Sequence, residues 1–123
     1  MKIPFSYLSA QFCDDEAEVI WRKVKPIVTT GSFTLGKELG EFEEAYAAKA
    51  GTRYAIGVAS GTDALALPLI AMGIKGEVIV PAHTFFASAG AIVQAGATPV
   101  FCDVGDDMNI DPDRILEKIT PRT

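Results

Sequence analysis

The segment Ala59–Leu65, which reads Ala-Ser-Gly-Thr-Asp-Ala-Leu, has the residue types of a phosphate-binding turn. It passes from an apolar stretch into a predicted helix, whose first amides lack internal acceptors and carry the positive end of the dipole. Gly61 would let an anion approach the backbone closely, and the Thr62 hydroxyl could add a hydrogen bond. From these residues alone, simple helix capping by Ser60 or Thr62 is the commoner role; Asp63 would then complement the dipole, and its carboxylate would compete with phosphate unless it points away.

A second segment, Val80–Ser88, carries aromatic side chains where a predicted strand ends. Open parallel sheets place their ligands at this end of their strands, so an aromatic ring here could stack on a flat ligand. The alternative is that Phe85 and Phe86 belong to the core of the helix that follows. His83 is the only histidine, and no serine, cysteine or metal partner stands near it, so we expect it in a turn or pocket wall.

The elements that must position these segments form an α/β pattern. Helices are predicted over Lys37–Ala50, Asp63–Met72 and Thr84–Ala95. A further helix begins at Asp14 and is limited by Pro26, and Gly51 ends the helix Lys37–Ala50. The last helix has Asp111 as its N-cap and Pro112 at its first helical position. Strands are predicted over Tyr54–Ala59, Glu77–Val80 and Thr98–Val104. Apolar strands joined by helices indicate a parallel sheet covered on both faces. Since sheets usually have about four to six strands, we expect a truncated domain.

Composition restricts the class of protein. The chain has 123 residues, of which 49% are hydrophobic and 22% charged, so a packed core is expected. The net charge of -5 argues against a nucleic-acid-binding surface. Cys13 and Cys102 lie far apart without a metal-binding pattern and are expected to be reduced thiols. We see neither a signal peptide nor an apolar run of about 18 residues, so a cytoplasmic location is expected.

Taken in order, a series of short motifs resembles the DegT/DnrJ/EryC1/StrS aminotransferase family. Each is weak alone, but they follow one another across nearly the whole chain. They are Gly31–Gly36, Phe42–Glu44, Ser60–Leu65, Glu77–Pro81, Thr84–Phe85, Gly96–Phe101, Asn109–Pro112 and Ile119–Thr123.

This resemblance implies a fold type I pyridoxal-phosphate-dependent enzyme, a homodimer with its active sites at the subunit interface. Members of the family transfer an amino group, usually from glutamate, to a keto-sugar carried by a nucleotide diphosphate. By position, Gly61 and Thr62 match the turn that binds the phosphate of pyridoxal 5'-phosphate. Phe85 matches the aromatic residue that stacks on its pyridine ring.

The resemblance also suggests a substrate site and a division of the chain. Gly31, Ser32 and Phe33 match a loop that helps to form the sugar-nucleotide site. Residues 1–51 would then form a helical segment with the substrate and dimer loop, and residues 52–123 the first part of the parallel cofactor-binding domain.

The sequence departs from the family pattern in three respects. The family's Schiff-base lysine and the acid facing the pyridine nitrogen lie beyond position 123. The turn Lys75-Gly76 is shorter than the family's usual turn before this strand, and Pro68 falls inside a predicted helix, where it costs about 3 kcal/mol unless the helix bends. No lysine stands in a matching motif, whether Lys2, Lys23, Lys25, Lys37, Lys49, Lys75 or Lys118.

Two functional hypotheses therefore share every motif. One is the N-terminal part of a sugar aminotransferase that has no activity by itself. The other is a catalytically inactive remnant that holds a phosphate ligand or dimerises. A Rossmann-type nucleotide-binding domain is disfavoured, because no GxGxxG follows the first predicted strand.

Overall fold

A computed structural model describes residues 5–8 and 11–123. Its internal contacts divide the chain into two units, Met1–Gly57 and Val58–Thr123, and each unit is described by itself. Among the described residues, no helix is both long and apolar enough to cross a membrane.

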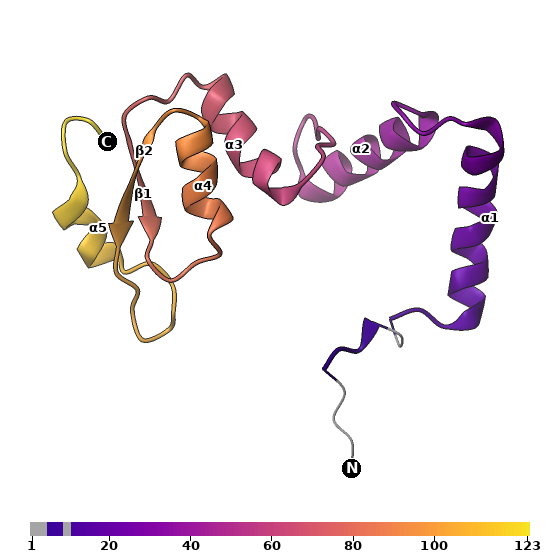
Figure 1. Ribbon diagram of the computed structural model, residues 1–123, viewed down its shortest axis with the longest axis horizontal. Coiled ribbons are helices and arrows are strands. Elements are labelled where there is room, and N and C mark those ends of the chain that lie inside the picture. Colours follow the sequence, from indigo (N-terminus) through magenta and orange to yellow (C-terminus); the bar gives the residue numbers. More distant parts are fainter. Residues whose placement is uncertain (1–4, 9–10) are drawn as a thin grey trace, which may run out of the picture. The chain divides into compact units, whose positions relative to one another are not determined.

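The first unit begins with helix α1, Asp14–Thr30 (Figure 1). The Glu16 carboxylate accepts the Cys13 backbone N–H at 3.0 Å, which stabilises the first turn and holds the pKa of Glu16 below its usual value. The predicted limit at Pro26 is wrong, because the helix continues to Thr30. A proline removes one backbone donor, whereas Gly31 adopts a left-handed conformation with φ 72° and ends the helix.

Helix α2 spans Lys37–Ala50, as predicted, and ends at Gly51 with φ 68°. After it the backbone turns back toward the helix, where the Glu43 carboxylate accepts the Gly57 N–H at 2.6 Å. The predicted strand Tyr54–Ala59 is not formed in the structure. A strand requires a ladder partner, and side-chain periodicity cannot supply one.

The second unit, Val58–Thr123, has the predicted parallel α/β architecture. Its elements are α3 (Gly61–Ala71), β1 (Glu77–Pro81), α4 (Ala87–Gln94), β2 (Thr98–Cys102) and α5 (Pro112–Lys118). β1 and β2 pair in parallel, with Glu77 opposite Thr98 and Pro81 opposite Cys102. The described sheet therefore has two strands instead of the predicted three.

The first residues of α5 and α4 show where local sequence signals predict a helix start correctly and where they do not. α5 begins as predicted, since the Asp111 side chain accepts the Asp113 N–H at 2.9 Å. By contrast α4 begins at Ala87 and not at Thr84, with Phe86 preceding it. The chain from Pro81 to α4 is therefore a loop, and both phenylalanines stand at its end.

A small apolar core holds this unit together. Val80 of β1, Ile92 of α4 and Ala97 before β2 are buried, and Leu69, Ile74 and Val78 pack against them. α3 packs on α4, α4 covers one side of the strands, and α5 contacts β2 from the other side (Figure 1). The core thus fixes α3 and α4 relative to the sheet.

The short turn before β1 has a structural role. Lys75 Nζ donates a hydrogen bond of 2.7 Å to the Ala95 carbonyl, where α4 ends. Gly96 follows with φ 80°, and the Ala97 N–H bonds the Ile92 carbonyl at 3.0 Å, which completes the helix termination. A lysine in this turn therefore satisfies a carbonyl that the helix itself leaves without a donor.

The segment after α5 lies beside the start of β1. The Glu77 N–H donates to the Arg122 carbonyl at 2.8 Å, and the Thr120 hydroxyl donates to the Glu77 carboxylate. Gly76 lies so close to the Arg122 carbonyl that a Cβ at this position would collide with it.

Candidate functional site

The turn before α3 is built around one serine side chain. Ser60 is the N-cap, and its Oγ accepts the Asp63 N–H at 3.1 Å. The same hydroxyl donates to Asp63 Oδ2 at 2.9 Å. The capping interpretation is therefore correct for Ser60, and the Asp63 carboxylate is held by the capping side chain.

Capping leaves two amides of this turn for a ligand. The Asp63 N–H is taken by Ser60 Oγ and the Ala64 N–H by the Ser60 carbonyl at 3.0 Å. The N–H groups of Gly61 and Thr62 precede the first internal helix bond and have no acceptor within the described part of the chain. A Cβ built on Gly61 would meet no heavy atom within 4 Å, so an anion has room beside this backbone. The residues present thus fit a phosphate group.

The loop between β1 and α4 carries the aromatic residues. Phe85 and Phe86 are 74% and 77% exposed, and neither contributes to the core. The Thr84 and Ser88 hydroxyls bond to each other at 3.0 Å, and the Phe85 carbonyl accepts the Ser88 N–H at 3.0 Å, so the loop closes into a turn. His83 lies in the same loop and is exposed.

The turn before α3 and the loop before α4 both lie in the second unit, and each leads directly into a helix. α3 and α4 pack against each other, and both begin on the side toward which the arrows of β1 and β2 point (Figure 1). Gly61 and Thr62 form the start of one helix, and Phe85 lies just before the other. This side of a parallel sheet is where α/β proteins bind their ligands.

The loop assigned to the substrate lies in the first unit. Gly31 is the C-cap of α1, the Ser32 N–H returns to the Ile27 carbonyl at 3.2 Å, and Phe33 is 69% exposed. The glycine- and threonine-rich sequence around Gly31 did not indicate that this residue would end a helix.

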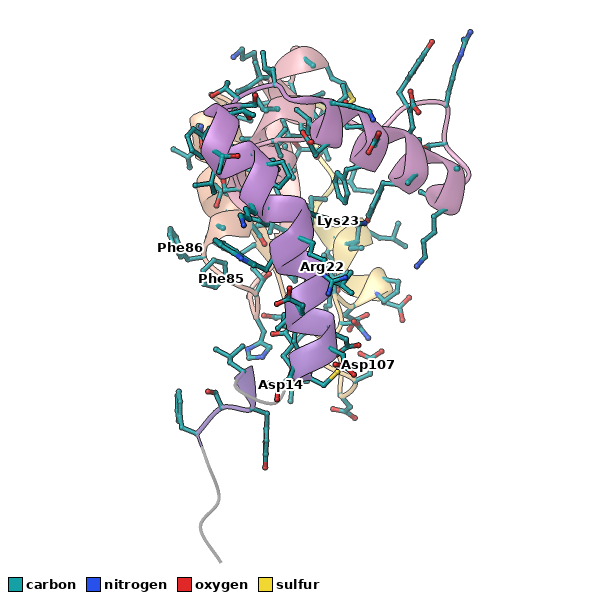
Figure 2. The ribbon with its side chains drawn as sticks, turned by 90° about the vertical axis from the view of Figure 1, so that its right-hand side faces the viewer. Asp14, Arg22, Lys23, Phe85, Phe86 and Asp107 are labelled. Atoms are coloured by element: carbon teal, nitrogen blue, oxygen red, sulfur yellow. The ribbon has the colours of Figure 1, made fainter. Side chains whose placement is uncertain are left out.

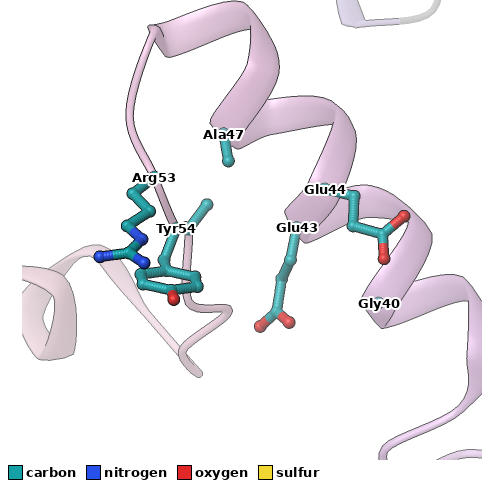
Figure 3. A pocket seen from close by; sticks show the side chains of 7 residues that line it. Gly40, Glu43, Glu44, Ala47, Arg53 and Tyr54 are labelled. Carbon is teal, nitrogen blue, oxygen red and sulfur yellow. The ribbon is translucent and has the colours of Figure 1, made fainter.

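The first unit also contains an open pocket of about 190 Å³ between α2 and the segment that follows it (Figure 3). Glu43 and Glu44 line it from the helix, and Arg53 and Tyr54 line it from the segment, with the guanidinium 5.4 Å from the ring centroid. One oxygen of Glu43 is bound by the Gly57 N–H. This hydrogen bond links α2 to the segment that follows it.

A sequence profile described as the DegT/DnrJ/EryC1/StrS aminotransferase family matches residues 14–123. The chain belongs to this family. The predicted family resemblance is therefore confirmed over nearly the whole chain.

Individual relatives agree with this assignment. The 3-oxo-glucose-6-phosphate:glutamate aminotransferase of Bacillus subtilis (strain 168) is 38% identical over 99% of this chain and 28% of its own length. The dTDP-3-amino-3,6-dideoxy-alpha-D-galactopyranose transaminase of Aneurinibacillus thermoaerophilus is 44% identical over 85% of this chain and 30% of its own. The crystal structure of ntda from Bacillus subtilis with bound cofactor PMP has a TM-score of 0.86 and 35% identity, covering 99% of this chain and 29% of that one.

DegT/DnrJ/EryC1/StrS relatives thus confirm the predicted fold type and pyridoxal-phosphate cofactor class, since PMP is the amine form of that cofactor. The chain spans less than a third of the length of these relatives. Their names differ in what the sugar carries, a phosphate in one and dTDP in the other.

Proposed function

We propose that this chain supplies the phosphate- and ring-binding part of a pyridoxal-phosphate-dependent aminotransferase, which transfers an amino group from glutamate to a nucleotide-linked keto-sugar. The observation that carries the proposal is the turn at the start of α3, in which Gly61 and Thr62 present two amides beside open space. Membership of an aminotransferase family supports it.

Each residue has a defined task toward the cofactor. The amides of Gly61 and Thr62 bind the phosphate, and the Thr62 hydroxyl adds a donor. The Phe85 ring packs on the flat face of the pyridine and orients it. When bound, pyridoxal phosphate supplies the electron sink and the carbonyl carbon through which amino groups are exchanged.

The anchoring residues can be tested in the full-length protein by titrating the cofactor-free form with pyridoxal phosphate. We expect Thr62→Ala combined with Gly61→Leu to nearly abolish binding, because both the hydroxyl and the space for the phosphate are lost. Phe85→Ala should weaken binding at least about fivefold but far less than loss of the phosphate anchor, since stacking contributes about 1 kcal/mol beyond area burial. Gly40→Leu is a matched control, because Gly40 is an exposed helical glycine with open space around its Cα. If the Thr62/Gly61 variant binds as tightly as the Gly40 control, the proposed phosphate site is wrong.

We further propose that the 123-residue chain alone does not sustain amino transfer. The proposal is supported by the lack of a lysine in a family-matching motif, and the amine of Lys75 is already engaged by the Ala95 carbonyl. Mixing the purified chain with cofactor, glutamate and candidate keto-sugars should give no turnover. Turnover that is lost on replacing one lysine would reveal a nucleophile that this proposal overlooks. A chain that binds phosphate or dimerises while the full-length protein also lacks activity would favour the inactive remnant.

The substrate and partner assignments concern the Gly31–Phe33 loop. We propose that this loop contributes to the sugar-nucleotide site and lies near the partner subunit's cofactor in a cytoplasmic homodimer. The exposed Phe33 ring and the absence of a core role for it support this placement. Competition between a dTDP-linked keto-sugar and a keto-sugar phosphate would test the nucleotide. A full-length protein that is monomeric in light scattering and fully active would refute the shared site.

A further inference from the structure

Two aromatic rings stand beside each other at the end of the loop that follows β1 (Figure 2). The Phe85 and Phe86 centroids are 5.2 Å apart and the ring planes are tilted by 59°, a geometry within the range of favourable aromatic pairs. Both rings are largely exposed. Since one ring is enough to cover one face of a flat cofactor, the second ring requires an explanation of its own.

Phe85 and Phe86 differ in their backbone hydrogen bonds. Phe86 has helical dihedrals, φ -55° and ψ -26°, and its carbonyl accepts the Gly90 N–H at 2.9 Å. The Phe86 ring lies over Gly90, where an added Cβ would be 3.8 Å from ring atom Cε2. The Phe85 carbonyl accepts only the turn bond from Ser88. The backbone of Phe86 is therefore held at the start of α4, and the Phe85 ring lies against the Phe86 ring.

We infer that Phe86 is a positioning residue, which holds the Phe85 ring in the orientation that stacks on the cofactor. The inference rests on the proposed cofactor site. Without Phe86, the exposed Phe85 side chain would sample several rotamers, and binding would have to order it. The ring of Phe86, and not its polarity or its effect on helix stability, is then the property that matters.

The test uses the full-length protein and four variants: Phe86→Leu, Phe86→Tyr, Phe85→Ala, and the double variant of Phe85→Ala with Phe86→Leu. Three quantities are measured: the cofactor dissociation constant, the visible circular dichroism of bound cofactor, and the melting temperature of the cofactor-free protein. Val93→Ala is a matched control, since Val93 is another exposed apolar residue of α4.

We expect Phe86→Leu to raise the dissociation constant about two- to fivefold, no more than Phe85→Ala does, and to reduce the visible dichroism, as loss of an aromatic pair predicts. The melting temperature of its cofactor-free form should match that of the Val93→Ala control. Phe86→Tyr, which keeps the ring, should bind as the unchanged protein does. The double variant should be no weaker than Phe85→Ala, because the effect of Phe86 passes through Phe85.

Several outcomes would overturn the inference. One is additivity in the double variant, and another is a loss in Phe86→Leu that exceeds the loss in Phe85→Ala, since Phe86 would then contact the cofactor itself. Unchanged binding in Phe86→Leu, together with weakened binding in Phe85→Ala, overturns the positioning role and leaves the cofactor site intact. Unchanged binding in Phe85→Ala overturns the proposed stacking face and the positioning role with it.

Discussion

Replacing Lys75 by methionine should destabilise the second unit by removing the hydrogen bond that ends α4. The amine is 2.7 Å from the Ala95 carbonyl, at the negative end of the helix dipole. Hydrogen bonds to charged groups contribute about 1.5–3 kcal/mol, but the Lys75 side chain is exposed and screening reduces this to about 1 kcal/mol. For a unit the size of Val58–Thr123, that loss lowers the melting temperature by roughly 4–8 °C.

The assay combines thermal unfolding with hydrogen exchange. Far-ultraviolet circular dichroism gives the melting temperature, and the Ala97 amide, bonded to the Ile92 carbonyl, reports on the helix end. Lys75→Arg should lose much less stability than Lys75→Met, because it keeps a donor with the same charge. Lys118→Met is a matched control, since Lys118 is another lysine at the C-terminal end of a helix of this unit, in the last turn of α5.

The result that would refute this reasoning is specific. If Lys75→Met unfolds at the same temperature as the unchanged chain and the Ala97 amide exchanges no faster, the hydrogen bond contributes nothing. Equal losses in Lys75→Met and Lys118→Met would show that the general dipole effect, and not the bond to Ala95, is responsible.

Three further predictions concern other contacts. The pKa of Glu16 is lowered by the backbone N–H that its carboxylate accepts, so its contribution to α1 is present above about pH 4.5 and is lost as the pH falls through the lowered pKa. Circular dichroism should show this acid-induced loss of helix, and Glu16→Gln, which does not titrate, should remove that pH dependence. Gly76→Ala should destabilise the second unit by about 1–3 kcal/mol in urea unfolding, because the new methyl group collides with the Arg122 carbonyl; unchanged stability would show that this segment moves away freely. Glu43→Ala should speed hydrogen exchange at Gly57, whereas Glu43→Gln, which keeps an acceptor, should preserve most of the protection.

Local signals in the sequence were sufficient where one residue decides an element's end. Asp111 was recognised as an N-cap and Gly51 as a helix stop, and both roles follow from the residue's own side chain or backbone freedom. Pro26 was misleading, because its ring costs one donor without preventing the helix from continuing to Thr30. Tyr54–Ala59 was misleading for another reason: its apolar content predicted a buried strand, but Tyr54 and Ile56 are exposed and the segment pairs with no strand in the described part of the chain.

Part of the candidate site could be predicted because it depends on local residue chemistry. The cap at Ser60 and the two amides after it follow from local chemistry, so their position before a helix was predictable. Whether Phe85 and Phe86 enter the core depends on where α4 begins, and hydrophobicity alone placed that start too early. The bond from Lys75 to Ala95 joins residues far apart in the sequence, and no pattern within either segment indicates it.

The reactivity of the two cysteines can report transient opening of the second unit. Cys13 is exposed before α1, whereas Cys102 ends β2 and is only 1% exposed. A thiol reagent should therefore modify Cys13 without any opening of the fold and Cys102 only during transient opening of the second unit. A ligand that binds only the closed unit must slow the labelling of Cys102 by the factor by which it stabilises that unit, and leave Cys13 unaffected. Mass spectrometry of one labelling reaction could thus measure phosphate or cofactor binding without any enzymatic turnover.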